Sequence, residues 1–511
     1  MPYRIRNGDD YPTWIGFIFV FNLIVGTGAL TLPAAFAKAG WLLSVAVIVL
    51  MGGISYMTAT FVIETMACAN AVFLWQCLQY LKKDQTSENA EYDDIENETD
   101  DPTEKLLPRS RAQLSTTIGS NSGSLEQIPL SAQRSQHYML DKKVEMGEMA
   151  GLFFNDFGRV MFYLCIVIYM YGDLSIYSAA VAKSLRDIVC QYNSTNISSS
   201  YLDTPTDALC WETHTMSRLD VYRLFLVAFI MTLAPFTLFS VQRTKYIQML
   251  TVLFRWLAFL SMIGLAVKAL LSDGPQGHPP PVNILNLPSL FGTCVYSFMC
   301  HHSLPSLIVP MSDKKNLKSV LSYDYILIGS FYIVLALTGS FAFSQLEDLY
   351  TLNFIPNSNS SLTLQCIEYF LALFPVFTLS ASFPVIAITL RNNLQTLFLD
   401  MSRFDSYNFF LRRLLFPIVA ILPPFAVTYF TESLTSLVGF TGSYAGTGIQ
   451  YIIPVALVYF ARRTCRDLLG LGLINEYRSP FRNSGWLIFV LIWSWTCMIL
   501  VTINFFTFNA S

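Results

Sequence analysis

The stretch FNLIVGTGALTLP, Phe21 to Pro33, interrupts the first strongly apolar segment of the chain. Gly26, Thr27 and Gly28 stand at about the depth where a membrane helix would cross the centre of the bilayer. Glycine weakens a helix, and hydrocarbon offers no partner to free backbone N–H and C=O groups. Two interpretations are open: close helix packing through the glycines, or an interruption that faces a polar binding cavity.

The composition around this stretch is that of a polytopic membrane protein. Of the 511 residues, 53% are hydrophobic and only 13% are charged. A typical soluble domain has roughly 25% charged residues, whereas lipid covers the apolar outer faces of a membrane bundle. The net charge of −3 gives no reason to expect a nucleic acid as a partner. No G-x-S-x-G or HExxH motif lies in a suitable context, so we do not expect an enzyme.

The apolar segments predict an all-α membrane protein. A bilayer core about 30 Å thick needs about 20 apolar helical residues. Eleven segments qualify, which gives about eleven transmembrane helices: 11–33, 41–68, 152–182, 222–241, 247–271, 287–311, 323–343, 363–390, 414–430, 433–460 and 486–508. The helical membrane core would therefore comprise residues 1–81, with the first two helices, and residues 150–511, with the other nine.

Basic residues in the short loops predict the orientation. With the N-terminus in the cytoplasm, most Lys and Arg residues fall in inside loops, and the outside loops 272–286 and 345–362 hold none. The C-terminus is then outside or lumenal, and the membrane is the plasma membrane or an endolysosomal one. Glycosylation sequons fall in segments that this topology places outside, at Asn193, Asn196, Asn359 and Asn509.

Two other features lie between the spans. Cys190 and Cys210 bracket one outside loop, and in an oxidising compartment they are candidates for a disulfide. Residues 82–149 hold ten Asp or Glu residues between Asp84 and Glu104 and then turn Ser- and Gln-rich. This composition predicts a disordered cytoplasmic loop. The alternative is a regulatory or sorting segment that binds a cytoplasmic partner.

A second interruption lies in the predicted sixth helix, at SFMCHHSLPSLIVP. Cys300, His301 and Pro305 stand in mid-span there, and helices one and six begin two sets of five. Two broken helices at matching places in two halves are typical of an inverted-repeat transporter. Free N–H groups would bind a substrate anion and freed carbonyls a cation. Cys300 and His301 are thus candidate substrate-binding residues, and His301 is either a proton acceptor or a donor that holds the broken helix.

Four helices resemble one known family. NLIVGTGALTLPAAFAKAGW, SFMCHHSLPSL, TLSASFPVIAITLRNNL and VGFTGSYAGTGIQYIIPVALVYF resemble the first, sixth, eighth and tenth helices of the amino acid/auxin permease family. The resemblance implies a leucine-transporter (LeuT) fold, with five plus five inverted helices and one extra. It also implies an amino-acid substrate and coupling to sodium or protons, with no cofactor beyond sodium as a co-substrate.

The same resemblance assigns roles to individual residues. Asn22 matches a family position linked to the cation, and Ser382 matches its partner on the eighth helix. Thr378 is one helical turn before Ser382 and shares its face, so it joins the cation-binding candidates. The backbone of five residues matches the family's substrate cradle: Val25, Gly26, Thr27, Gly28 and Ala29. The second histidine of the pair and the long acidic insertion depart from the family pattern. The first departure bears on which substrate is bound, and the second leaves room for regulation.

Asp173 on the third helix is a candidate by a different argument. A carboxylate within the membrane is costly and is functional by default, but Asp173 is either a coupling residue or a solvated group at the boundary. Tyr177 follows one turn later on the same face, as a candidate substrate contact. The sequence therefore favours a secondary active amino-acid transporter. The alternative is an amino-acid sensor or signalling scaffold that acts through the loop 82–149.

Overall fold

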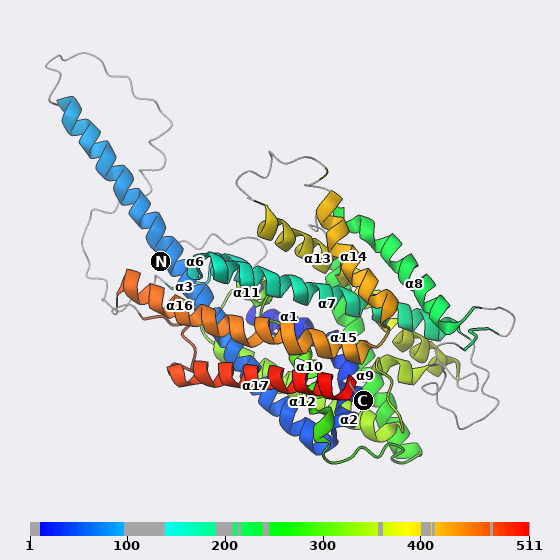
Figure 1. Cartoon of the computed structure of the whole chain (residues 1–511). Coiled ribbons are helices and arrows are strands. Elements are labelled where there is room, and N and C mark those ends of the chain that lie inside the picture. Colours follow the sequence, from blue (N-terminus) through cyan, green and yellow to red (C-terminus); the bar gives the residue numbers. More distant parts are fainter. Residues whose placement is uncertain are drawn as a thin grey trace.

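The computed structural model describes residues 11–96, 138–190, 208–211, 216–238, 245–355, 361–399, 410, 414–470 and 474–509. Within these ranges the fold is a bundle of helices (Figure 1). The β pairing in the same ranges amounts to two isolated bridges, Tyr11 with Met311 and Leu209 with Ser217. The prediction of an all-α membrane protein is confirmed at this level.

Eight spans in the described residues are long and apolar enough to cross a membrane. A ninth is a bent pair, in which α1 (Thr13–Ile24) and α2 (Thr27–Ala39) meet at 54°. The eight are α3 (Trp41–Glu96), α7 (Asp156–Val189), α8 (Arg218–Leu233) with η2 (Ala234–Leu238), α9 (Lys245–Ser272), α12 (Leu317–Ala342), α13 (Leu362–Phe398), the run from α15 to α16, and α17 (Ser484–Asn509). That run comprises α15 (Leu434–Thr441), two π-helical turns η7 (Gly442–Gly446) and η8 (Gly448–Ile452), and α16 (Ile453–Leu469).

The other two predicted spans are built from shorter helices. The segment 287–311 forms α10 (Leu287–Ser297) and α11 (Leu304–Ile308), with six residues between them that are not α-helical. The segment 414–430 contains α14 (Phe416–Phe430), which carries three prolines. Proline lacks the N–H that a helix interior needs, so such segments are weaker as continuous helices.

The interrupted helices lie at the centre of the bundle. Eleven of the 13 residues of α2 are buried, and α10 is buried along most of its length. By contrast, only 22% of the apolar window of α17 is buried, as is typical of an outer helix. Small side chains explain the placement of α2, because Gly28, Ala29, Ala34 and Ala35 let neighbouring helices approach closely.

The segment 82–149 differs from the prediction of a disordered loop at both ends. The helix α3 continues to Glu96 and projects beyond the bundle (Figure 1). At the other end, residues 138–149 lead into α6 (Met146–Phe153), whose neighbours are α3, α7 and α16. Apolar side chains fix this end, since Tyr138, Leu140 and Val144 are each no more than 6% exposed. Residues 97–137 lie outside the described part of the chain.

Gly28 tests the close approach of the two interrupted helices. A Cβ atom at Gly28 would lie 2.6 Å from both the Cα and the Oγ of Ser297. Gly28→Ala is therefore expected to lower the free energy of unfolding by about 1 to 3 kcal/mol, as overpacking of a core does. The thermal midpoint of the purified protein in detergent measures this effect.

Gly26→Ala is the matched control, because a Cβ at Gly26 meets no atom within 4 Å. Its midpoint is expected to stay close to that of the wild type. Equal losses in the two variants would contradict the packing argument, since they would point to backbone freedom as the role of both glycines.

Candidate functional site

The first interruption releases backbone groups between α1 and α2. The N–H of Gly26 donates to the carbonyl of Ile24 at 2.9 Å, not to that of Asn22 as in a continuous helix. The carbonyl of Asn22 instead accepts a hydrogen bond from the guanidinium of Arg255 on α9. At the start of α2, the first N–H groups have no acceptor within the helix, which makes this end a site for a negative charge.

The second interruption does the same between α10 and α11. The last α-helical bond of α10 runs from Phe298 N to Cys294 O, and Met299 N then bonds to Tyr296 O, only three residues back. The carbonyl of Ser297, which a continuous helix would use for His301 N, is left for another donor. The chain turns helical again at Leu304, whose N–H donates to the carbonyl of Cys300.

One side chain joins the two interruptions. The hydroxyl of Tyr332 on α12 lies 3.1 Å from the carbonyl of Ile24 and 2.8 Å from that of Ser297. A hydroxyl has a single hydrogen, so it donates to one of the two carbonyls at a time. Tyr332 is fully buried, and no water is needed to explain how these carbonyls find a donor. The interruptions that follow α1 and α10 are therefore joined through the hydroxyl of Tyr332.

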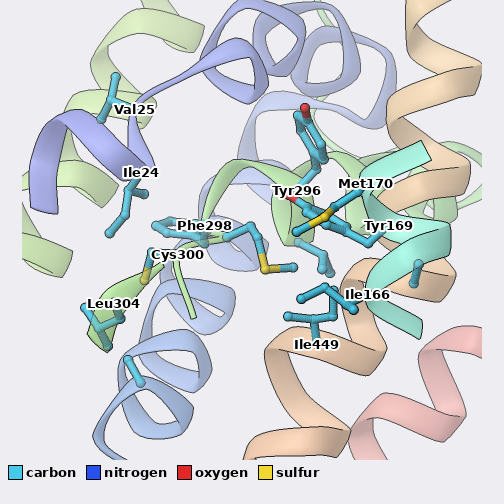
Figure 2. Close-up of a cluster of buried hydrophobic side chains, with 14 of the residues drawn as sticks. Ile24, Val25, Ile166, Tyr169, Met170, Tyr296, Phe298, Cys300, Leu304 and Ile449 are labelled. Carbon is cyan, nitrogen blue, oxygen red and sulfur yellow. The ribbon is translucent and has the colours of Figure 1, made fainter. Parts of the chain in front are cut away.

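Asp173 lies in a cluster of aromatic side chains beside this structure. The hydroxyl of Tyr296 on α10 donates to Oδ1 of Asp173 at 2.6 Å, and Asp173 is 5% exposed. The ring of Tyr169 lies 5.6 Å from that of His302 and 6.3 Å from that of Tyr296. Figure 2 shows Tyr169 and Tyr296 on facing elements, with the residues of the interruptions nearby. Asp173 is thus a buried group in this structure and not a solvated one at the boundary.

The other predicted substrate contacts have neighbours on several helices. Tyr177, one turn after Asp173, faces Thr27 at the start of α2. Cys300 contacts the hydroxyl of Tyr325 at 3.2 Å. Nε2 of His301 lies 2.9 Å from the hydroxyl of Thr58 on α3, so the histidine ties the second interruption to a neighbouring helix. This contact is what a structural role for His301 requires.

Of the three predicted cation ligands, Ser382 and Thr378 have hydrogen-bonded side chains, whereas the side-chain oxygen of Asn22 does not. The hydroxyl of Ser382 donates to the carbonyl of Thr378 at 3.1 Å, and that of Thr378 donates to the carbonyl of Phe374 at 2.9 Å. Oδ1 of Asn22 is buried and has no hydrogen-bond partner in the described structure. No described hydrogen bond joins Asn22 to Ser382. What contacts Asn22 is Arg255, at its carbonyl.

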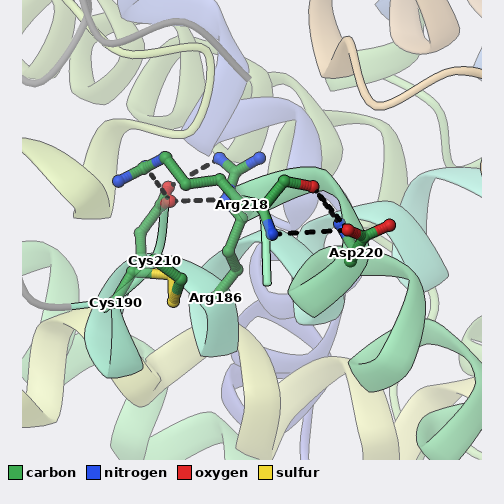
Figure 3. The surroundings of a disulfide bond; sticks show 7 residues. Arg186, Cys190, Cys210, Arg218 and Asp220 are labelled. Carbon is green, nitrogen blue, oxygen red and sulfur yellow. Dashed lines mark hydrogen bonds and ion pairs between the residues drawn. A yellow bond between two sulfur atoms is a disulfide. The ribbon is translucent and has the colours of Figure 1, made fainter. Parts of the chain in front are cut away.

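A network of charged groups joins the helices at one end of α7. Arg186 bonds to Asp187 at 2.7 Å and to Glu432, in the link between α14 and α15, at 2.5 Å. Arg218 at the start of α8 also bonds to Asp187, at 2.7 Å. Figure 3 shows Arg186 and Arg218 beside a disulfide bond. This bond joins the two cysteines proposed from the sequence, Cys190 and Cys210, with their Cα atoms 4.7 Å apart.

A second charged group lies nearer the other end of the bundle. Both carboxylate oxygens of Glu64 on α3 accept from the guanidinium of Arg462 on α16, each at 2.8 Å. The N–H of Ser479, in the segment before α17, donates to the same carboxylate at 2.9 Å. Glu64 is buried and fully bonded, so it ties α3, α16 and the α17 segment together.

The chain is similar to a known family and to several known proteins. The family model described as "Transmembrane amino acid transporter protein" matches residues 11–97 and 132–467. The chain belongs to this family. It is 56% identical to the transmembrane protein 104 homolog of Drosophila melanogaster, over 99% of this chain and 100% of the relative. It is 44% identical to transmembrane protein 104 of Homo sapiens, over 98% and 97%. A homolog from Dictyostelium discoideum is 31% identical, over 97% of each chain.

These matches confirm the family predicted from the sequence. The family is one of transporters and not of enzymes. A multi-pass membrane protein follows from the family and from the apolar helices together. The names of the relatives state no substrate and no driving ion.

Sequence reasoning missed two charged residues. Arg255 stands inside the predicted span 247–271, and a charge at that depth is itself a signal of function. Asp324 on α12 is 0% exposed, and both its carboxylate oxygens are buried without a hydrogen-bond partner in the described structure. It lies near the start of its helix, where a carboxylate is easily taken for a solvated group. The signal for Tyr332 is weaker, because a tyrosine in an apolar span is usually part of the core.

Neither the predicted sequons nor an apolar groove of the described structure contributes a residue to the interruptions. Asn193, Asn196 and Asn359 fall outside the described residues, and Asn509 is the last residue of α17. A groove of about 440 Å³ lies between α8 and α14, and its lining is almost wholly apolar. No residue of the interruptions lines it, so it offers nothing to a charged amino acid.

Tyr332→Phe tests the joint between the two interruptions. The variant keeps the ring but removes the donor, so two buried carbonyls lose their shared hydrogen bond. We expect the free energy of unfolding to fall by about 1 to 3 kcal/mol, measured as a lower thermal midpoint. Tyr323→Phe on the same helix is the control, because Tyr323 is 68% exposed. Unchanged stability of Tyr332→Phe would show that another donor replaces the hydroxyl.

Proposed function

We propose that the protein is a secondary active transporter that moves amino acids across a membrane by alternating access. The observation that supports this most is the pair of interrupted helices at the centre of the bundle, joined through Tyr332. Irregular backbone at membrane depth is tolerated where protein shields it or where it lines a cavity. The proposed arrangement is the LeuT one, in which α1 with α2 and α10 with α11 are the first helices of two inverted sets of five, and α17 is the extra helix.

The released groups have the chemistry that a zwitterion needs. Within the predicted cradle 25–29, the N–H groups of Val25, Gly26 and Ala29 already donate to backbone carbonyls, so those of Thr27 and Gly28 at the start of α2 would bind the substrate carboxylate. The carbonyls at the ends of α1 and α10 would accept from the ammonium group, because each carbonyl has two lone pairs. Tyr177 and Thr27 would border the bound molecule on the side of α7. The side chain that the site prefers is not part of this proposal.

Asp173 is proposed as the group that couples transport to an ion gradient. It is buried on α7 and hydrogen-bonded to Tyr296 on α10, so its charge and the interrupted helix affect each other. The driving ion is a proton or sodium. The ion pairs Arg186–Glu432 and Glu64–Arg462 lie toward different ends of the bundle and would open in turn during alternating access.

Uptake into proteoliposomes tests the function. The purified full-length chain is expected to take up a labelled amino acid when a proton or sodium gradient is imposed. Asp173→Asn keeps an acceptor for Tyr296 but cannot be protonated or charged. The variant should therefore still exchange amino acids between the two sides. Its gradient-driven uptake should be at least tenfold slower than that of the wild type. Asp156→Asn is the matched control, because the Asp156 side chain on the same helix is 95% exposed.

The same assay separates transport from the alternative function of a sensor or signalling scaffold. Absence of flux and of exchange with every amino acid, under either gradient, would contradict transport. The observation that favours a sensor is α3, which projects beyond the bundle toward the acidic segment (Figure 1). Replacing residues 97–137 by a Gly/Ser linker of equal length should leave flux unchanged in a transporter. In a sensor it would abolish the capture of a cytoplasmic partner.

The proposed orientation places the N-terminus in the cytoplasm and the C-terminus outside or in a lumen. The membrane is the plasma membrane or an endolysosomal one. In that orientation the disulfide Cys190–Cys210 faces an oxidising compartment, as such bonds require. Glycosidase treatment of the protein from cells should increase its mobility on a gel, and removal of Asn193, Asn196, Asn359 and Asn509 together should abolish the shift. A shift that survives the removal of all four would contradict the proposed orientation.

A further inference from the structure

Arg255 occupies the backbone group that the first interruption releases. It lies on α9, within the apolar span Thr251–Ser272, and is partly buried. Its guanidinium donates to the carbonyl of Asn22, which has lost its usual helix partner because Gly26 N bonds to Ile24 O. Trp256, the next residue, stacks on Phe21 with the ring centroids 4.4 Å apart. Two adjacent residues of α9 are thus fixed against two adjacent residues of α1.

The positive charge of Arg255 has no carboxylate to balance it among the described residues. The groups that interact with it electrostatically are the hydroxyls of Tyr177 and Tyr332, which are neutral at physiological pH. A guanidinium does not give up its proton in a protein, so this charge is permanent. An unpaired charge at membrane depth is costly, and such residues are kept where they act in function.

Arg255 lies where a bound cation would lie, and not where the substrate carboxylate is expected. It contacts the last turn of α1, where the carbonyls form the negative end of the helix dipole. The substrate carboxylate is expected at the opposite place, at the N-terminal end of α2. Asn22, whose carbonyl it bonds, is also the residue that the family resemblance assigns to the driving cation.

We propose that Arg255 is a resident cation that takes the place of sodium at Asn22, so the site works without sodium. This inference rests on the proposed function, but the experiment that tests it needs no transport. A sodium ion bonded to the same carbonyl would lie about 4 Å from the guanidinium, and the repulsion weakens its binding by roughly a thousandfold at the effective dielectric of protein sites. Transport would then be driven by protons, or by the amino-acid gradient alone.

The proposal also predicts what removal of the guanidinium does. In Arg255→Ala, the backbone carbonyl of Asn22 loses its hydrogen-bond donor. The side-chain Oδ1 of Asn22 already has no partner in the described structure. Two adjacent oxygens without donors are ligands that suit a hard cation. The variant should therefore gain a binding site for sodium that the wild type does not have.

A sodium titration of the purified full-length protein is the experiment. The thermal midpoint is measured from 0 to about 200 mM NaCl, with choline chloride added to keep the ionic strength constant. We expect no sodium-specific shift for the wild type, none for Arg255→Lys, and a saturable increase for Arg255→Ala. Arg391→Ala is the matched control, because Arg391 also donates to a backbone carbonyl, that of Thr237 at 2.6 Å, away from Asn22. It should stay insensitive to sodium.

Several outcomes would overturn the proposal. A sodium-dependent rise in the wild-type midpoint would show that the ion binds beside Arg255. Flux driven by sodium in the wild type would do the same. If Arg255→Ala stays insensitive to sodium and instead loses preference for a free carboxylate over the amino-acid amide, Arg255 binds the substrate.

The test separates this proposal from the proposed function. The titration needs no substrate, so a sodium response gained only by Arg255→Ala supports the resident cation even if no flux is found. Conversely, sodium-driven uptake by the wild type would support transport and refute the resident cation. If Arg255→Ala does not fold, Arg255→Gln and the wild-type titration decide the question, because the neutral amide removes the charge with less loss of volume.

Discussion

The hydroxyl of Tyr332 serves two carbonyls that belong to two different interrupted helices. Hydrocarbon supplies no donor at membrane depth, so the Ser297 carbonyl, which has lost its helix partner, depends on a donor such as Tyr332. Gly28 lets α2 approach Ser297 closely enough for the two to share one partner. Movement of α1 and α2 against α10 and α11 must therefore change what Tyr332 bonds. In a cycle of alternating access, this hydroxyl is placed to pass from one carbonyl to the other.

The helix α7 connects the centre of the bundle, where Asp173 contacts Tyr296, to groups at both ends of the helix. Its middle holds Asp173 against Tyr296, and its last turns are tied to α8 and to the α14–α15 link through Arg186 and the Cys190–Cys210 disulfide. Its first turns pack on α6, which also contacts α3 and α16. A change at Asp173 can thus reach either end through one rigid helix. The buried pair of Glu64 and Arg462 holds α3 and α16 together.

The sequence predicted an all-α membrane protein because lipid imposes a length and a composition on each apolar segment. It also predicted both interruptions, since Gly26 and Pro305 disfavour a continuous helix. It did not predict Tyr332 as the joint, because contacts between distant helices leave no periodic signal. Arg255 was visible as a charge in an apolar span, but its partner was not. The ends of the acidic segment differ because local apolar residues, such as Leu140 and Val144, outweigh an overall polar composition.

The two donors that hold the interruptions differ in charge, and in the proposed transporter this difference would orient a bound zwitterion. Arg255 brings a permanent positive charge to the end of α1, whereas Tyr332 brings none to the end of α10. The substrate ammonium is repelled by the guanidinium, so the carbonyl of Ser297 is its better acceptor. The carboxylate of the proposed substrate would be held by the N-terminal end of α2, away from Arg255. The charge that is proposed to exclude sodium would therefore also direct the ammonium group toward the end of α10.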